Sequence, residues 1–354
     1  MTAGVSSPSV LVTAPPRHRA SLGRSVLSFL LNNSLLIVLL VELAAFSIVL
    51  KDRFLSKDVL VLVVQNSAAV GVILPFYVAC LIAGQIDLSV ISIGNLGALV
   101  FAMLMLPAFG LPLAAALFVA LLFALLVGLF NTWLILRVGV PSLVATLAVG
   151  TAGAGLAYLI TDTFGSTFSQ IKITAPAFRG LIISGFLGTG LSMPVYLMLG
   201  LYIVYYVLLN HTRLGAHMYA VGGNRRAAYL AGIQVLPITV FCLTGVAVGT
   251  TLASIFLGVR LLTTGAATTF SAAAASTGSS EIPVPLVAAV IAGIGLSGGT
   301  GRIERTLLGV LFFSVLTLGM GILTLAPPVR VIIEGAAIVL AIVLDSARQH
   351  LESR

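Results

Sequence analysis

Residues 113–136 read LAAALFVALLFALLVGLFNTWLIL, an apolar run that contains no charged side chain. A helix of about 20 apolar residues is long enough to cross the hydrocarbon core of a bilayer. A membrane-spanning strand would instead show about ten residues of alternating polarity. This continuous run therefore predicts a transmembrane helix, in which the backbone satisfies its own hydrogen bonds.

Similar runs recur along the whole chain. Of its 354 residues, 59% are hydrophobic and only 8% are charged, and the mean hydropathy is +1.18. A soluble domain carries about 25% charged residues. The composition predicts an all-α fold, a polytopic transmembrane helix bundle of about ten spans. The expected spans are residues 29–50, 60–83, 88–106, 113–136, 142–161, 194–210, 236–258, 283–300, 306–325 and 329–345.

The basic residues predict how these spans are oriented. The net charge is +8, but the 18 Lys and Arg side chains lie scattered between apolar runs and form no basic stripe of the kind that binds nucleic acid. With the N-terminus inside, most of them lie on the cytoplasmic side, as the positive-inside rule requires. We therefore expect both termini in the cytoplasm and no nucleic-acid partner.

The chain divides into one membrane domain and two tails. Residues 1–27 are too polar to bury a core and predict a disordered cytoplasmic tail. Residues 28–346 form the expected transmembrane domain, whose first span is longer than the apolar region of a signal peptide and reads as a retained anchor. Residues 347–354 form a short cytoplasmic tail. Only the loops at 162–193, outside, and 211–235, inside, are sizeable.

Two glycine-rich segments interrupt the apolar pattern: GQIDLS at 84–89 and GIGLSGGTG at 293–301. A broken backbone is tolerated at membrane depth only where protein or a water-filled cavity satisfies it, and paired breaks in the two halves of a transporter mark its pathway. We interpret both segments as parts of a pathway or gate; two tight loops at the membrane surface are the alternative. The pathway or gate candidates are Asn66, Gln85, Asp87, Ser89, Ser297, Gly298 and Gly299.

Three carboxylates lie in or beside expected spans, where a buried charge is costly. Asp87 either belongs to the pathway or caps the next helix. Glu42 lies inside the first span and should face the bundle or be protonated. Glu334 lies in the last span, where Arg330 is a potential structural partner at i,i+4 spacing. If these groups couple transport to an ion, the chain is instead a secondary transporter.

The inner loop contains the segment GGNRRAAYLAGI at 222–233. Asn224 is placed to cap a two-turn helix that runs from Arg225 to Ala231, and Gly232 is placed to end it in the left-handed conformation. A short, self-capped helix is a natural docking element, in which small residues such as Ala228 would lie deep in a partner's groove; a surface helix without a partner is the alternative. The candidate coupling residues are Gly222, Gly223, Asn224, Arg225, Ala227, Ala228 and Gly232.

Enzyme motifs are absent from the sequence. Leu296–Gly299 spell LSGG, as in the signature of ABC-type ATPases, but no Lys is followed by Ser or Thr, so the phosphate-binding loop is missing. The four His residues show no metal-ligand spacing, and Cys80 and Cys242 lie in apolar runs. We therefore expect no catalytic residues, no metal and no cofactor. A membrane-embedded enzyme is the least favoured class.

From about residue 35 to residue 346, the chain resembles the bacterial ABC-transporter permeases of the ribose, xylose and galactose type, within the branched-chain amino acid and simple-sugar permease family. The segment from Tyr219 to Ile233 matches, and its part at 222–233 is the most specific match. Gln85, where the family has a second Gly, and residues 281–295, which lack the family's acidic run, depart from the pattern. The other matching segments are 65–71, 84–89, 131–147, 296–301 and 335–345.

This resemblance implies a multi-pass permease of the bacterial inner membrane, in contact with membrane lipid, and not an enzyme. Its implied partners are a second permease chain, identical or different, a cytoplasmic ABC ATP-binding subunit that grips the 211–235 loop, and an extracytoplasmic substrate-binding protein. The implied substrate is a sugar or a similar polar small molecule.

Overall fold

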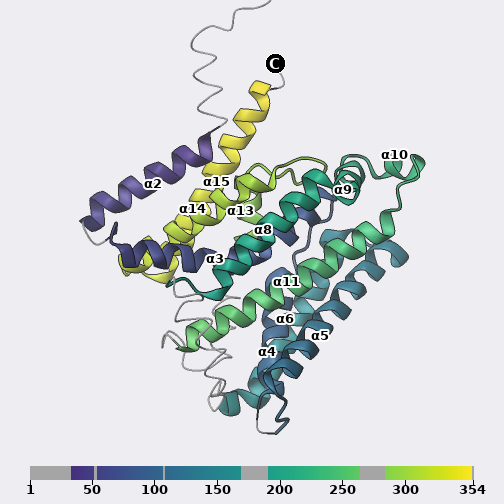
Figure 1. Cartoon of the computed structure of the whole chain (residues 1–354), viewed down its shortest axis with the longest axis horizontal. Helices are drawn as coiled ribbons and strands as arrows, with labels where there is room; N and C mark the ends of the chain where they lie inside the picture. The colour runs from purple at the N-terminus through teal and green to yellow at the C-terminus, as the bar shows by residue number, and fades with distance from the viewer. Residues whose placement is uncertain (1–32, 52–53, 107, 169–189, 264–283, 353–354) are drawn as a thin grey trace, which may run out of the picture.

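The computed structural model describes residues 33–51, 54–106, 108–168, 190–263 and 284–352. Within these ranges every regular element is helical (Figure 1), with twelve α-helices and one π-helical segment, η2. The elements are α2 Ser34–Leu50, α3 Lys57–Ile82, α4 Val90–Leu104, α5 Leu113–Trp133, η2 Leu134–Val138, α6 Ser142–Phe168, α8 Met193–His211, α9 Arg213–Gly223, α10 Arg225–Leu230, α11 Val235–Thr263, α13 Val284–Ile291, α14 Ile303–Ile322 and α15 Pro327–Glu352.

The all-helical membrane fold expected from the sequence is confirmed. Among the described residues, six helices are long and apolar enough to cross a bilayer: α3, α5 with η2, α6, α8, α11 and α14. The α2 and α4 helices are apolar but shorter. The expected first and last spans correspond to α2 and α15, although residues 29–32 lie outside the described ranges, and α15 continues into the expected C-terminal tail.

The span expected at 283–300 is wrong as a single helix. The helix α13 has only eight residues, which at about 1.5 Å per residue fall far short of a bilayer core of about 30 Å. The chain then turns at Gly293 and continues without regular structure to Arg302. Both Gly293 and Gly298 have positive φ angles, 84° and 82°, which glycine adopts without steric cost. The glycines that identified this segment thus also end its helix.

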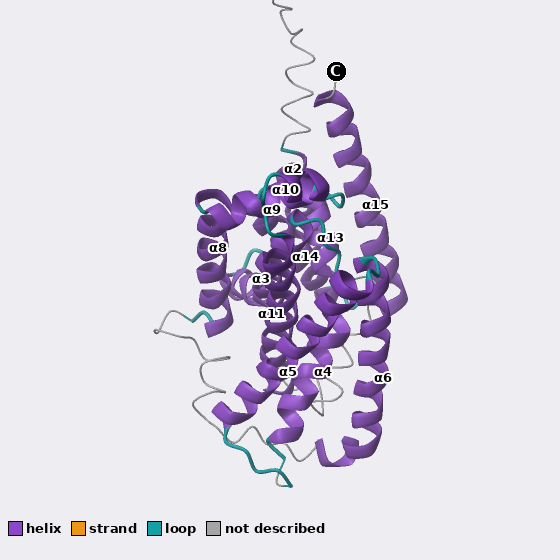
Figure 2. Ribbon diagram, turned by 90° about the vertical axis from the view of Figure 1, so that its right-hand side faces the viewer, coloured by secondary structure: helices purple, strands orange, loops and turns teal. Residues whose placement is uncertain are grey.

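Close helix packing centres on α11, which lies against α3, α4 and α5 (Figure 2). Glycines make this approach possible, because a side chain in their place would collide with α11. A Cβ atom at Gly128 of α5 would lie 2.6 Å from the Cα of Thr244, and one at Gly94 of α4 would lie 2.6 Å from the hydroxyl of Ser254. Small residues at helix interfaces are the usual means of packing in lipid.

The outer surface of the bundle is apolar. On α5 the small residues Ala120 and Ala124 are buried, whereas the large side chains of Phe118, Leu126 and Trp133 are more than half exposed. A soluble helix would show the reverse arrangement. The exposed apolar face therefore fits contact with lipid.

Candidate functional site

The inner loop folds into two helices, of which only the second was expected. Asn224 accepts a 2.9 Å hydrogen bond from the amide of Ala227 and so caps α10. Gly232 follows the helix with a φ of +83°. These two predictions are confirmed. The first helix, α9, begins where Thr212 accepts a hydrogen bond from the amide of Gly215 at 3.2 Å. This threonine cap was the overlooked signal for α9.

Five glycines from three distant parts of the chain meet at the end of α9. We call this contact the glycine junction; its members are Gly84, Gly222, Gly223, Gly298 and Gly299. A Cβ atom at Gly222 would collide with the carbonyl oxygen of Ile82, and one at Gly298 would lie 2.7 Å from the Cα of Gly84. The junction is therefore backbone packed directly against backbone. It joins both interrupted segments to the inner loop, a contact that the sequence did not predict.

Two hydrogen bonds hold the segments of the junction together. The amide of Gly299 donates to the carbonyl of Ile82 at 2.8 Å, and the hydroxyl of Tyr219 in α9 donates to the carbonyl of Gly301 at 2.9 Å. Burial raises the pKa of Tyr219, and the nearby carboxylate of Glu304 raises it further. The hydroxyl therefore keeps the proton that it donates. The sequence placed Tyr219 in a segment that matches the family but assigned it no role; it lies one helical turn before the paired glycines of α9.

The 84–89 segment is enclosed by protein, as a broken backbone in a membrane requires. Two of its three buried polar residues pair with each other: the carboxylate of Asp87 accepts hydrogen bonds from the amide and hydroxyl of Ser89, at 2.8 and 2.5 Å. These bonds close a local turn before α4, whose N-cap residue is Ser89, so Asp87 does not cap the first turn of the helix as the capping alternative expected. Asn131 of α5 donates to the Ser89 hydroxyl at 3.3 Å, and Thr146 of α6 accepts from the amide of Leu88 at 3.0 Å.

Gln85 and Ser297 lie in the turns next to the glycine junction. Gln85 is buried, and its backbone amide donates a hydrogen bond to the carbonyl of Cys80 at 3.0 Å. Ser297 is exposed and precedes Gly298. Both pathway candidates therefore lie beside the inner loop, in the turns that leave α3 and α13.

A cavity of about 610 Å³ lies among α3, α4, α11, α13, α14 and α15. Val90, which follows the first interrupted segment, lines it, and so do Val284 and Pro285 at the start of α13, the helix that leads into the second segment. The first interrupted segment thus connects this cavity to the glycine junction directly, and the second is connected to the cavity through α13. The polar residues of the lining are Asn95, Thr250, Ser254, Thr317, Arg330 and Glu334.

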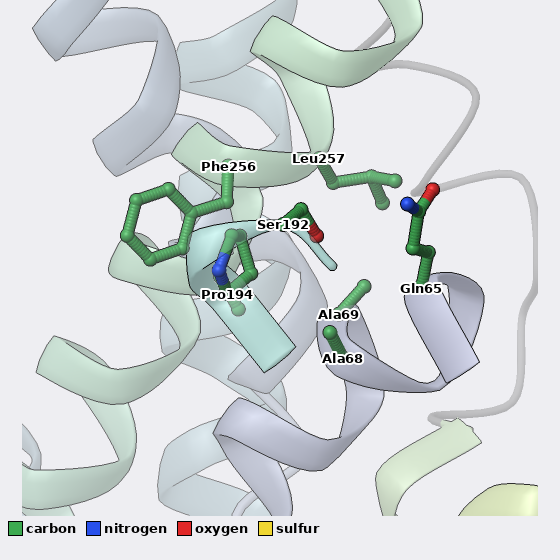
Figure 3. Close-up of a pocket in the computed structure, with 8 residues that line it drawn as sticks. Gln65, Ala68, Ala69, Ser192, Pro194, Phe256 and Leu257 are labelled. Atoms are coloured by element: carbon green, nitrogen blue, oxygen red, sulfur yellow. The ribbon is translucent and has the colours of Figure 1, made fainter. Parts of the chain in front are cut away.

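A smaller pocket adjoins the cavity and shares Ala69, Ala253 and Leu257 with it. Figure 3 shows the side chain of Gln65 from α3 at this pocket, near Ser192. The Gln65 amide group donates to the carbonyl of Gly190 at 3.3 Å. The pocket has room for about one water molecule. Asn66, the next residue, is half-buried in α3 and lines neither cavity.

A third hollow, a groove of about 1310 Å³, lies between α10, the end of η2 and the start of α11. Arg137, Arg225 and Arg226 line it, together with Tyr229 and Leu230, whose side chains are 70% and 77% exposed. The chain itself buries Ala228, which is 5% exposed. Our expectation that Ala228 would enter a partner's groove is therefore wrong, because this side chain faces the bundle.

The two remaining carboxylates occupy different surroundings. Glu42 of α2 is buried, and within the described part of the chain neither of its carboxylate oxygens has a hydrogen-bond partner. Glu334 of α15 lines the 610 Å³ cavity, as does Arg330. The Nε of Arg330 donates to the carbonyl of Leu325 at 2.8 Å. The two side chains share one face of α15 at the cavity.

Comparison with known proteins identifies related sequences. The model of the family described as the permease component of branched-chain amino acid transport systems matches residues 59–342. The L-arabinose ABC transporter permease protein of Azospirillum brasilense is 30% identical over 95% of this chain and 93% of its own length. The ribose import permease protein of Haemophilus influenzae and the autoinducer 2 import system permease protein of an Enterobacter strain are each 28% identical, over 90% of this chain and 94% of their own lengths. No solved structure gives a significant match.

Proposed function

Because the chain belongs to the permease-component family of branched-chain amino acid transport systems, we propose that it is the membrane-spanning subunit of an ABC importer. It forms the path for a sugar or a similar polar small molecule, as the names of the L-arabinose and ribose relatives suggest. ATP is hydrolysed by a separate subunit. The observation that carries this proposal is the glycine junction, which joins the inner loop to both interrupted segments, the first next to the cavity and the second connected to it through α13.

The coupling surface that we propose for the ATPase is α10 with its groove. Tyr229 and Leu230 project from the chain as an exposed apolar pair, and three arginines lie around them. Exposed apolar side chains with a charged rim are typical of protein interfaces. Ala227 lies on the exposed side, and Asn224 and Gly232 fix the two ends of the helix. The buried Ala228 anchors α10 to the bundle.

Movement of the coupling surface passes from α9 to the glycine junction. Backbone atoms packed directly together contain no flexible side chain that could absorb a displacement. A shift of Gly222 therefore moves Gly84 and Gly298 with it. The first interrupted segment then carries the shift to Val90, and the second carries it through α13 to Val284, at the cavity. In this mechanism the connecting segments open or close the path. Their candidate residues are Gln85, Asp87, Ser89 and Ser297–Gly299.

We place both termini and α9–α10 in the cytoplasm. We propose a permease domain at 28–346 between two tails. This domain has about ten membrane segments, and α13 crosses only part of the bilayer. The last turn of α15 lies toward the same edge of Figure 1 as α9 and α10, which supports this orientation. A reporter active only in the cytoplasm should be active when fused after Arg354 and silent when inserted at Gly110, between α4 and α5.

The remaining partners complete an importer. A substrate-binding protein delivers the solute to the outer side, and a second permease chain, identical or different, pairs with this one. Lipid covers the exposed apolar face of α5. The ion-coupled alternative is weaker, because Asp87 is held in a local turn by Ser89 and the similar proteins are named as ABC or import permeases.

Affinity purification in mild detergent tests this function. The tagged chain should retain an ATP-binding subunit, whereas Leu230→Asp should reach the membrane normally and lose that subunit. Leu126→Ile, on the exposed face of α5, is a control that should retain it. A chain that carries out uptake without any ATP-binding subunit would contradict the proposal.

A further inference from the structure

The groove beside α10 carries charge of one sign only. Arg137, Arg225 and Arg226 line it, and no acidic residue does. The elements that form it supply no counter-charge, because no Asp or Glu occurs at 113–138 or at 213–263. Within the described part of the chain, none of the three guanidinium groups pairs with a carboxylate. Like charges in one groove repel each other, so the groove is suited to an anion from outside the chain.

The rest of the lining beside the arginines is largely apolar. Leu136 of η2 contributes to it, and so do Leu236 and Pro237 at the start of α11. The side chain of Leu236 is 57% exposed. A small inorganic anion would leave these apolar side chains in water. A ligand with a hydrocarbon part next to its negative group would cover both kinds of lining.

A pair of exposed aromatic side chains lies next to Arg137 on the same helix. Phe130 and Trp133 are 50% and 52% exposed, and their rings stack with centroids 5.9 Å apart. Trp133 precedes Arg137 by about one turn, so the two side chains lie on the same side of the helix. Tryptophan is enriched where a membrane protein crosses from hydrocarbon to headgroups. The aromatic pair therefore marks this boundary, and the arginine lies just beyond it.

The length of the helix places Arg137 at the level of lipid phosphates. The α5 and η2 segments together have 26 residues, which at about 1.5 Å per residue span roughly 39 Å. This length exceeds a hydrocarbon core of about 30 Å and reaches into the headgroup regions. Arg137 lies in the last turn of η2. Its guanidinium group is therefore at a depth where phospholipids carry their negative charge.

We propose that this groove binds the phosphate group of an anionic phospholipid of the cytoplasmic leaflet. Arg137 and the two arginines of α10 hold the phosphate, which guanidinium groups bind through paired N–H donors. An acyl chain lies along Phe130 and Trp133. The lipid thus links α10 to the end of η2, while Tyr229 and Leu230 remain for the ATP-binding subunit. The cytoplasmic side of this site rests on the orientation given with the proposed function.

The fluorescence of Trp133 tests the site directly, because this is the only tryptophan in the chain. The purified full-length chain is reconstituted without an ATP-binding subunit into phosphatidylcholine vesicles. These contain either brominated phosphatidylglycerol or brominated phosphatidylcholine, whose bromine atoms quench a tryptophan that they contact. We expect the anionic lipid to quench at least threefold more effectively per molecule. Trp133→Phe supplies the background signal.

Substitutions of the arginines identify the groups that select the lipid. We expect Arg137→Gln to abolish the preference for the anionic lipid and Arg137→Lys, which keeps a phosphate-binding charge, to retain most of it. Arg213→Gln is the matched control, because Arg213 is exposed at the start of α9 and does not line the groove. Size-exclusion chromatography shows whether each variant is folded. If Arg137→Gln does not fold, Arg226→Gln should lower the preference at least twofold.

Several results would overturn the lipid site. One is equal quenching by the two lipids in the wild type, and another is a preference that survives both arginine-to-glutamine changes. Competition by inorganic phosphate would reduce the site to one for a free anion. Weak quenching by both lipids would mean that a protein surface, such as a second permease chain, covers Trp133. Loss of the preference when the ATP-binding subunit is added would assign the whole groove to that subunit.

These measurements are independent of the proposed transport function. They require neither uptake nor ATP hydrolysis, so equal quenching by the two lipids leaves the importer proposal unchanged. Conversely, if the wild-type chain retains no ATP-binding subunit in a pull-down, the importer proposal fails while the lipid preference of the isolated chain can still be observed.

Discussion

The backbone amide of Gly299 donates a 2.8 Å hydrogen bond to the carbonyl oxygen of Ile82. This bond joins the turn after α13 to the last residue of α3, beside the glycine pair that ends α9. A contact between three backbones leaves no space for side chains. The glycine junction is therefore the part of the molecule where small substitutions should have the clearest consequences.

The first prediction compares the two neighbouring glycines of α9. A Cβ atom at Gly222 would collide with the carbonyl of Ile82, whereas one at Gly223 would meet no atom within 4 Å. Overpacking of this kind costs about 1–3 kcal/mol. We expect Gly222→Ala to lower the melting temperature and to reduce uptake at least tenfold, and Gly223→Ala to behave as wild type. Equal uptake by the two variants would show that the junction transmits nothing.

The second prediction concerns the hydroxyl of Tyr219. Tyr219→Phe removes the hydrogen bond to the carbonyl of Gly301 and keeps the ring, at a cost of about 1 kcal/mol. We expect normal expression, a severalfold slower uptake, and an ATP-binding subunit that still co-purifies. Tyr158→Phe is the matched control, because Tyr158 of α6 is 76% exposed and lies outside the coupling surface and the glycine junction. An unchanged uptake rate in Tyr219→Phe would exclude this bond from coupling.

The third prediction concerns the cap of α10. Asn224→Ala removes the acceptor for the Ala227 amide, and loss of such a cap costs about 1 kcal/mol. Because α10 has only six residues, we expect weaker retention of the ATP-binding subunit in pull-down experiments. Asn224→Asp also caps helices and should restore it. Failure of Asp to restore binding would assign the effect to the amide group itself.

The fourth prediction separates the two faces of α10. Ala228 is buried and Ala227 is exposed. An unpaired charge buried in the protein is costly, so Ala228→Glu should reduce the amount of folded chain recovered from the membrane. Ala227→Glu should leave that amount unchanged and weaken retention of the ATP-binding subunit. Fluorescence-detected size-exclusion chromatography followed by a pull-down measures both effects. The opposite pattern would mean that α10 docks through its other face.

The sequence alone determined the features that depend on neighbouring residues. Apolar runs predicted the helices, because a helix in lipid satisfies its backbone within one segment. The cap at Asn224 and the turn at Gly232 were predictable because each depends only on residues close by in the sequence. The helix predicted at 283–300 was too long, because hydropathy records only how apolar a segment is. The segment that follows α13 contains apolar residues without being helical.

The tertiary structure alone decided which of these segments touch. Glycine shows that a close approach is possible but not with which partner, so the meeting of Gly84, Gly222 and Gly298 was invisible in the sequence. The inward direction of Ala228 and the shared cavity of Arg330 and Thr317 depend likewise on how whole helices pack. Each of these contacts joins residues far apart along the chain. Such contacts are set by the three-dimensional packing of the bundle, which no local pattern of residues encodes.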